Sequence, residues 1–258
     1  MNTSNTFEVI IIGGSYAGLS AGLALGRSLR KTLIIDSGKP CNRQTPHSQN
    51  FLTQDGQKPS DIANLGREQV AAYDTVSLLN ELVIDGKKTD KGFEVHTESG
   101  KTFQAKKLIF ATGIKDIMPE IIGFAECWGI SVIHCPYCHG YEFRGQKTAI
   151  LANAERAFHL AAMVNNLTDQ ITILSSDKAE YSSEQLQKLE NNNIQIVEDE
   201  LVEIEHEKGQ LKTLLFASGE KRHFDAVYAS IPFEQHSDLP AKLGCELTEE
   251  GYIKTDEF

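Results

Sequence analysis

Apolar runs alternate with segments of helical spacing along the first part of the chain. Residues 7–12 and 32–35 are apolar runs that predict buried strands, and the apolar spacing over 19–29 predicts a helix between them. Residues 60–74 predict a second helix, with Ser60 as its N-cap. Further short strands are expected over 76–84, 92–97, 101–103 and 107–110. Strands that alternate with helices in this way are typical of β-α-β units.

The same alternation returns in the second half of the chain. Three strands and two helices are predicted there, in the order 147–151, 155–166, 171–174, 182–192 and 194–197. Ser182 or Ser183 can cap the second of these helices. Residues 210–217 and 224–231 are expected to add antiparallel strands. The pattern therefore predicts an α/β fold that contains two doubly wound, Rossmann-like units.

A glycine-rich turn follows the first predicted strand, with the sequence Gly13-Gly14-Ser15-Tyr16-Ala17-Gly18. Gly13 allows a tight turn, Gly18 allows helix and strand to pack closely, and the helix N-terminus would face a pyrophosphate. Asp36 ends the next strand, where it would accept a hydrogen bond from an adenosine ribose hydroxyl. Ser15 stands where the fingerprint has its middle glycine, and its hydroxyl could bind a phosphate oxygen. The flanking elements favour a dinucleotide site over a turn that binds nothing.

A polar stretch begins at Ser37 and is long for a plain connection. Long ordered loops tend to contact ligands. Arg43, His47 and Asn50 are the candidates within it, and a solvated loop residue is the alternative for each.

The second unit lacks a comparable turn, because its first strand leads into Ala152-Asn153-Ala154-Glu155. No glycine allows close backbone approach, and Glu155 would repel a phosphate at the helix N-terminus. The next strand leads into Ser175-Ser176-Asp177, with no arginine to bind a 2′-phosphate. We expect this unit to have the fold without its usual nucleotide.

Between the two units lies Cys135-Pro136-Tyr137-Cys138, which can close a small disulfide ring in two-electron chemistry. Pro136 suits the first position of a helix, so Cys135 is expected at the N-cap, where free backbone N–H groups favour a thiolate. His134 and His139 flank the pair, and either could take a thiol proton.

The Cys135/Cys138 pair has three other interpretations. Cys135 to His139 also spells the attachment motif of c-type haem, which needs an exported chain. A structural zinc site needs a second pair of ligands, whereas Cys41, Cys127 and Cys245 are scattered and are taken as structural. Two ordinary buried cysteines are the third reading. We favour a redox dithiol over these, and no metal is expected.

Composition narrows the class of protein. A hydrophobic content of 40% supports a packed core, and 258 residues allow one large domain or two smaller ones. The net charge of -11 argues against a nucleic-acid partner or an anionic membrane surface. The polar N-terminus lacks the basic start of a signal peptide, and five cysteines, an odd number, do not suit a disulfide scaffold. A cytoplasmic location is the expectation.

These motifs, in this order, resemble the low-molecular-weight thioredoxin reductase family of flavoproteins. The resemblance covers nearly the whole chain through the glycine turn, Asp36, the Cys135/Cys138 pair, a closing segment over 247–255 and the triplet Ala111-Thr112-Gly113. The residues from Cys135 to Glu142 look most like the dithiol oxidase branch, which includes the gliotoxin and holomycin oxidases. The resemblance implies FAD as cofactor and a homodimer.

The resemblance also implies the domain limits, with the second domain inserted into the first. Residues 1–115 would form the first segment of the FAD-binding domain, 116–242 a central pyridine-nucleotide-type domain with the dithiol, and 243–258 the start of the returning segment. The family continues with a Gly-Asp segment that binds the FAD ribitol and a helix aimed at the flavin. The expectation is a fragment or truncated product with poor FAD affinity.

Carried over residue by residue, Cys138 would be the thiol next to the flavin C4a carbon and Cys135 the thiol that exchanges with substrate. His139 occupies the position of the reductases' aspartate acid/base. Asp36 would bind the FAD ribose, Ala111 to Gly113 would touch the flavin, and Asn50 would lie near the isoalloxazine.

The expected function is that of an FAD-dependent thiol–disulfide oxidoreductase. It would oxidise a small-molecule or peptide dithiol, with oxygen as acceptor, and a thioredoxin-like protein is a further candidate partner. NADPH use is doubtful, because the nucleotide fingerprint of the reductases falls on Ala152 to Ala154 and their arginines fall on Ser176 and Asp177. One alternative is an NAD(P)H-dependent thioredoxin reductase. The other is a catalytically silent, truncated flavoprotein-like module.

Overall fold

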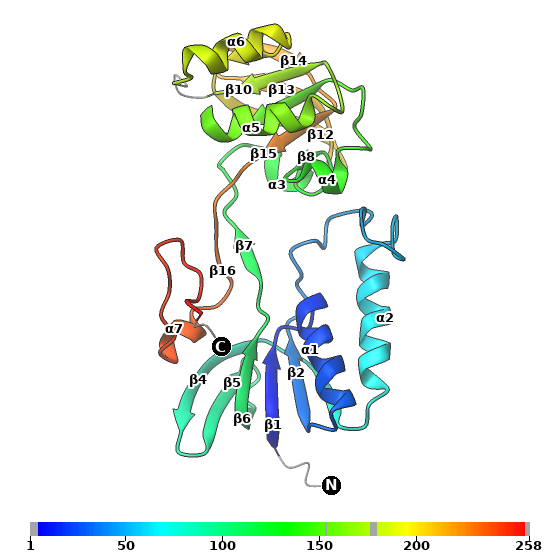
Figure 1. The fold of residues 1–258 in the computed structure, drawn as a ribbon, viewed down its shortest axis with the longest axis vertical. Helices are drawn as coiled ribbons and strands as arrows, with labels where there is room; N and C mark the ends of the chain where they lie inside the picture. The colour runs from blue at the N-terminus through cyan, green and yellow to red at the C-terminus, as the bar shows by residue number, and fades with distance from the viewer. Residues whose placement is uncertain (1–4, 153, 176–179, 256–258) are drawn as a thin grey trace. The chain divides into compact units, whose positions relative to one another are not determined.

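The computed structural model describes residues 5–152, 154–175 and 180–255 (Figure 1). The chain forms two compact units. Unit 1 contains Met1–Arg43, Ser60–Lys115 and Phe233–Phe258, and unit 2 contains Gln44–Pro59 and Asp116–Pro232. The second unit is inserted into the first, and each has a doubly wound α/β sheet, which confirms the predicted fold class. Residues 44–59, which the expected limits put with the first segment, belong to unit 2, and residues 233–242, which they put with the central domain, belong to unit 1.

Unit 1 is built on a six-stranded sheet with the strand order β3-β2-β1-β6-β5-β4. Its elements are β1 (Thr6–Ile12), α1 (Tyr16–Arg27), β2 (Thr32–Asp36), α2 (Pro59–Ala71), β3 (Val76–Asn80), β4 (Val83–Thr89), β5 (Gly92–Thr97) and β6 (Thr102–Phe110). The first four strands of that order run parallel, whereas β5 and β4 pair antiparallel.

The apolar runs form the middle of this sheet because both of its faces are covered. Ile10 and Ile35 pack on one face against Leu239 of α7 (Leu239–Lys242), and Ile11 and Ile34 pack on the other face with α1 and α2 (Figure 1). The β1 and β6 strands end side by side at the pair Ile12 and Phe110. Ligands of such sheets bind at the carboxyl ends of the strands where the strand order reverses.

Three local predictions for unit 1 differ from the structure. The single strand predicted over 76–84 is two strands, because β3 ends at Asn80 beside β2 and β4 begins at Val83 beside β5. Helix α2 begins at Pro59, whose fixed φ suits a first helical position, so Ser60 lies inside the first turn and is not the N-cap. Strand β6 is continuous where two strands were predicted, because the intervening Gln104 and Ala105 pair with both β1 and β5.

Unit 2 is built on a five-stranded parallel sheet with the order β11-β10-β9-β15-β8 and a three-stranded antiparallel sheet β12-β13-β14. Its elements are α3 (Phe124–Cys127), β8 (Val132–Ile133), α4 (Pro136–His139), β9 (Thr148–Leu151), α5 (Ala154–Val164), β10 (Ile171–Leu174), α6 (Ser183–Asn191), β11 (Gln195–Val197), β12 (Leu201–Glu207), β13 (Gln210–Phe216), β14 (Lys221–His223) and β15 (Ala226–Ala229). Ser182 caps α6 in a reciprocal capping box with Gln185, which confirms that prediction. The strands β7 (Ile114–Asp116) and β16 (Phe233–Gln235) pair with each other where the chain passes from unit 1 to unit 2 and back.

The prediction that residues 224–231 form an antiparallel strand is wrong. Strand β15 runs parallel to β9 and β8, and all four of its residues are buried. A run that is buried on both faces suits the centre of a parallel sheet. The antiparallel partners of β13 are instead β12 and the short strand β14, neither of which the pattern revealed.

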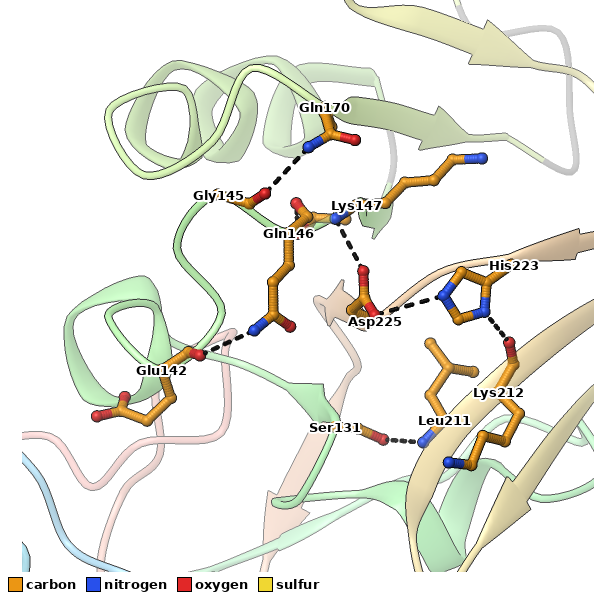
Figure 2. Close-up of polar contacts among 11 residues, drawn as sticks. Ser131, Glu142, Gly145, Gln146, Lys147, Gln170, Leu211, Lys212, His223 and Asp225 are labelled. Atoms are coloured by element: carbon orange, nitrogen blue, oxygen red, sulfur yellow. Dashed lines mark hydrogen bonds and ion pairs between the residues drawn. The ribbon is translucent and has the colours of Figure 1, made fainter.

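The connection from α4 into β9 is held by polar contacts with distant parts of unit 2 (Figure 2). Gln170 donates from Nε2 to the carbonyl of Gly145 at 3.0 Å, and the backbone N–H of Lys147 donates to Oδ2 of Asp225 at 3.0 Å. Asp225 also lies 3.4 Å from Nε2 of His223. These contacts fix where the segment that follows α4 enters the sheet at β9. None of the helices in the described ranges is both long and apolar enough to cross a membrane.

Candidate redox and dinucleotide sites

The dithiol lies on α4, a single helical turn directly after strand β8. Cys135 is its N-cap residue with extended φ and ψ of -118° and 118°, and Pro136 takes the first helical position, as predicted. The backbone N–H of Cys138 donates to the carbonyl of Cys135 at 3.2 Å. Both cysteines are half-buried.

The two thiols have different surroundings. Burial raises the pKa of Cys138 to about 11, and the neighbouring Cys135 adds to this through a hydrogen bond and its charge. Cys138 therefore remains a thiol at neutral pH when the pair is reduced.

His139, the last residue of α4, is the candidate base of this site. Among the described residues, neither of its buried ring nitrogens has a hydrogen-bond partner. Burial lowers the pKa of His139, and the carboxylate of Glu142 opposes this shift only in part. The imidazole is therefore neutral at pH 7 and has a lone pair available for a proton. His134 lies on the other side of Cys135 and is exposed.

Tyr228 of β15 is a neighbour of the dithiol that sequence reasoning missed. Its pKa is raised to about 12, first by burial and then by the charges of Cys135 and Glu142. A Cβ on Gly140 would lie 2.9 Å from Tyr228 Oη and 2.4 Å from the carbonyl oxygen of Pro136. Gly140 thus allows α4 to pack closely on β15. No local signal marks Tyr228, which reaches this place through its pairing with Ile133 of β8.

In unit 1, a cleft of about 530 Å³ opens at the carboxyl ends of β1 and β6. All the predicted cofactor residues except Gly18, Arg43 and Asn50 line it: Gly13, Gly14, Ser15, Tyr16, Ala17, Asp36, Ser37, Ala111, Thr112 and Gly113. Sequence reasoning missed the part of the lining that comes from distant segments: Glu81, Leu82, Val83, Gln235, His236, Ser237, Pro240, Tyr252 and Ile253. The first three directly follow β3, and the others lie in residues 233–258 of unit 1, where only Tyr252 and Ile253 belong to the stretch over 247–255 that carries the resemblance.

The glycines of the turn are required by close backbone approach. Gly13 has a φ of +104°, and a Cβ there would lie 2.2 Å from the carbonyl oxygen of Ala111. A Cβ on Gly18 would lie 1.9 Å from the carbonyl oxygen of Gly13. Ser15 is the N-cap of α1 but makes no capping bond with its side chain, and the first turn of α1 has no acidic residue. This cradle fits a diphosphate, which binds to backbone N–H groups at a helix N-terminus.

Asp36 stands at the end of β2, as predicted for a residue that binds ribose. Its Oδ1 accepts a hydrogen bond from the backbone N–H of Gly14 at 3.1 Å. Its Oδ2 lies 2.7 Å from Nη2 of Arg67, a residue of α2 that sequence reasoning missed. The carboxylate is thus held in one orientation at the edge of the cleft.

Three predicted residues of the polar stretch do not line the cleft. Arg43 donates to the carbonyl of Pro40 at 3.3 Å and does not line the cleft. Asn50 belongs to the segment that packs with unit 2, where it has a φ of +57° and its N–H donates to Asp55 at 2.7 Å. His47, in the same segment, contacts the carbonyl of Gly56 through Nδ1 at 3.0 Å.

The corresponding turn of unit 2 joins β9 to α5. Helix α5 begins at Ala154 and has Glu155 in its first turn, as the sequence predicted. Asn153, Ser176 and Asp177, on which the doubt about NADPH also depends, lie outside the described residues.

Comparison with known proteins identifies the class. The profile of the pyridine nucleotide-disulphide oxidoreductase family matches residues 7–258. Thioredoxin reductase tcpT of Claviceps purpurea is 37% identical over 71% of this chain, and thioredoxin reductase sirT of Leptosphaeria maculans is 30% identical over 96% of it. The aligned chain spans 60% of tcpT, 59% of aclD from Aspergillus oryzae and 81% of sirT.

Solved structures agree. A putative thioredoxin reductase, TrxB, from Bacillus anthracis superposes with a TM-score of 0.92 at 30% identity, covering 98% of this chain and 85% of that one. HlmI superposes with a TM-score of 0.89 at 28% identity, covering 99% and 81%. The resemblance predicted from the motifs is therefore confirmed. The chain belongs to the pyridine nucleotide-disulphide oxidoreductase family, and it is a thioredoxin reductase-like member of that family.

Proposed function

We propose that this chain is an FAD-dependent thiol–disulfide oxidoreductase that oxidises a small-molecule or peptide dithiol to a disulfide, with oxygen as final acceptor. The observation that carries the proposal is the one-turn helix α4. It presents Cys135 and Cys138 together with a half-buried, neutral His139 whose ring nitrogens are buried. The motif from Cys135 to Glu142, which resembles that of the dithiol oxidase branch, supports this direction of the reaction.

The reaction begins from the Cys135–Cys138 disulfide. One substrate thiolate attacks Sγ of Cys135 and forms a mixed disulfide, and the electron pair of the broken bond passes to Sγ of Cys138. The high pKa of Cys138 means that this sulfur takes up a proton as it leaves. The second substrate thiolate then attacks the substrate sulfur of the mixed disulfide. It releases Cys135 and closes the product disulfide, so two electrons and two protons have moved to the protein.

His139 provides the base for these steps. A neutral imidazole with unpartnered nitrogens can accept the proton of a substrate thiol and return it to a leaving thiolate. Because a buried imidazolium is disfavoured, the proton does not remain on His139. His134 is exposed and lacks this environment.

The cleft of unit 1 would hold FAD. The N–H groups that follow Gly13 would bind the pyrophosphate, Asp36 the adenosine ribose, and Ala111 to Gly113 would line the flavin side. FAD, when bound, would accept two electrons and so return the dithiol to the disulfide. Dioxygen is the proposed final acceptor, and its product is hydrogen peroxide.

Cysteine substitutions test the proposal. Cys138→Ser leaves Cys135 without a disulfide partner, so the substrate thiolate has no disulfide to attack, and aerobic oxidation of dithiothreitol should fall at least about 1000-fold, as for loss of a nucleophile. Cys245→Ser, which changes an exposed cysteine of unit 1, is the matched control and should keep the full rate. Oxygen consumption and the flavin spectrum are measured together. A Cys138→Ser protein that retains FAD and the wild-type rate would refute the proposal.

A second candidate is an NAD(P)H-dependent thioredoxin reductase, because tcpT and sirT carry that name. The two functions differ in the reductant of the flavin. Under anaerobic conditions, bleaching of the flavin band by dithiothreitol but not by NADPH supports dithiol oxidation. Prompt bleaching by NADPH supports the reductase.

A further inference from the structure

The carboxylate of Asp36 lies between two hollows of unit 1. Gly14 and Asp36 line both the cleft of about 530 Å³ and a neighbouring cavity of about 340 Å³. Arg67 lines the smaller cavity. The other residues around the smaller cavity are Ile34, Gly38, Leu78, Leu79 and Asn80.

Arg67 and Gly14 each bind a different oxygen of this carboxylate. The Gly14 N–H binds Oδ1 at 3.1 Å, and Arg67 Nη2 binds Oδ2 at 2.7 Å. Gly14 can come this close because it has no side chain, since a Cβ there would lie 2.8 Å from Cβ of Asp36. The carboxylate therefore cannot turn without breaking one of these two bonds.

Stability alone does not account for this ion pair. The Arg67 side chain is 39% exposed and that of Asp36 is 22% exposed. Exposed ion pairs add little to folding, because solvent screens them and two long side chains must be ordered. Asp36 is also the residue at the end of β2 where a dinucleotide presents its ribose hydroxyls.

An ionised carboxylate has about four lone-pair sites. Gly14 and Arg67 use one on each oxygen, which leaves one on each oxygen for the two hydroxyls of a ribose. A carboxylate that is already oriented accepts those hydroxyls without losing further side-chain freedom on binding.

We infer that Arg67 is a positioning residue for the adenosine ribose of the cofactor and acts through Asp36. The inference rests on the proposed function only in taking FAD as the ligand. Arg67 holds the carboxylate in the orientation that accepts the ribose, and it does not itself bind the cofactor.

The test is a double-mutant cycle, with the dissociation constant of FAD measured by flavin fluorescence on the full chain. Arg67→Gln should weaken FAD binding about tenfold, the effect of one lost charge-assisted contact. Asp36→Asn should weaken it at least as much. Because Arg67 acts through Asp36, the double variant should bind FAD no more weakly than Asp36→Asn alone.

Two further variants separate positioning from a general structural effect. Arg67→Lys keeps a cation beside Asp36 and should stay within about threefold of wild type. Arg30→Gln breaks the ion pair of Arg30 with Glu8, also in unit 1, and should leave FAD binding unchanged. Thermal unfolding of each variant shows whether unit 1 remains folded.

Several results would overturn the inference. Equal losses from Arg67→Gln in the wild-type and Asp36→Asn backgrounds would mean that Arg67 binds the cofactor directly. Unchanged FAD binding in Arg67→Gln would mean that the ion pair does not contribute to binding. Tighter FAD binding would mean that Arg67 competes with the ribose for Asp36. A wild-type chain that binds no FAD would remove the proposed cofactor as well, and the wild-type titration alone shows this.

Discussion

The two units repeat one β-α-β-α-β arrangement, and they differ where the first strand meets the first helix. In unit 1 the turn from β1 to α1 has glycine at the two positions where the backbone comes closest, Gly13 and Gly18. In unit 2 the turn from β9 to α5 has Ala154 and Glu155 at the start of the helix. Ala157 is the sixth residue after β9, as Gly18 is the sixth after β1, and it is fully buried.

This difference shows that the fold does not by itself create a nucleotide site. Both sheets place a helix N-terminus beside the carboxyl end of a central strand, which is the geometry that favours an anion. Only unit 1 combines it with a backbone that approaches closely and a helix start free of acidic residues. Unit 2 instead has the dithiol on its sheet edge at β8. Four changes test whether unit 1 binds the cofactor while unit 2 carries the thiol chemistry.

The largest effect is expected from the base of unit 2. His139→Gln keeps a polar side chain but cannot accept a thiol proton, so the rate of dithiol oxidation at pH 7 should fall by about 1000-fold. FAD binding should not change, because the cleft is lined by residues of unit 1. Steady-state oxygen consumption and an FAD titration measure the two quantities. His134→Gln, at the exposed histidine, is the control, and an equal loss there would assign the base to His134.

The next effect tests the glycine turn. Gly18→Ala drives a Cβ into the carbonyl oxygen of Gly13, which should lower the free energy of unfolding by ~1–3 kcal/mol. The shifted turn should weaken FAD binding about 100-fold, equivalent to one or two charge-assisted hydrogen bonds.

Ala157→Gly makes the reverse change in unit 2 and should cost about 1 kcal/mol through helix propensity and about 0.8 kcal/mol more through the loss of a buried methyl group, with FAD binding unchanged. Urea unfolding and flavin fluorescence measure both variants. Wild-type FAD affinity in Gly18→Ala would show that close approach is not what distinguishes unit 1.

A smaller effect concerns the ionisation of Cys138. Burial is the largest cause of its raised pKa of about 11, so most of the shift should persist in Cys135→Ser. In that variant, iodoacetamide at pH 8 should label Cys138 about tenfold more slowly than an ordinary thiol, since the smaller thiolate fraction outweighs its greater nucleophilicity.

The labelling rate should still rise as the pH increases above 9.

The sign of the effect on folding follows from the same shift. The raised pKa stabilises the folded chain below pH 9, and this contribution is lost as the pH rises toward 11. Exposed Cys245 serves as the internal reference in peptide mass spectrometry. Equal labelling of Cys138 and Cys245 at pH 8 would contradict the raised pKa.

The smallest effect tests the lost nucleotide site of unit 2. Glu155→Gln removes the negative charge from the first turn of α5 and should tighten NADPH binding two- to fivefold, the range of a charge near a helix terminus. Glu184→Gln removes the matching charge from α6 and should have no effect. NADPH fluorescence titrations compare the two. Unchanged binding in Glu155→Gln would mean that the missing glycines, and not the charge, decide against the nucleotide.

Local signals predicted their elements well, because the contacts that form them span only a few residues. Pro136 after Cys135 placed the thiol at the cap of α4, and Ser182 with Gln185 placed the start of α6. The first glycine turn was recognised because Gly13 and Gly18 meet within one strand-turn-helix. The motifs that carry the family resemblance could be found because each of them also spans only a few residues.

Contacts between distant segments escaped the sequence analysis. Strands β12, β13 and β14 lie between β11 and β15 in the chain and form a separate sheet. The path of the chain through them sets the direction of β15, so the apolar run of β15 alone did not show that it is parallel to β9. Tyr228 meets Gly140 only through the pairing of β15 with β8.

The sequence by itself determined the α/β class, the glycine cradle, the carboxylate at the end of β2 and the dithiol at a helix cap, because short-range sterics and hydrogen bonding specify each of them. The tertiary structure alone decided what surrounds these groups. Helix α2 carries Arg67 to Asp36, 31 residues away along the chain, and burial under neighbouring elements leaves His139 neutral and Cys138 protonated. Ion pairing and desolvation depend on which segments pack together, and packing is a property of the whole fold.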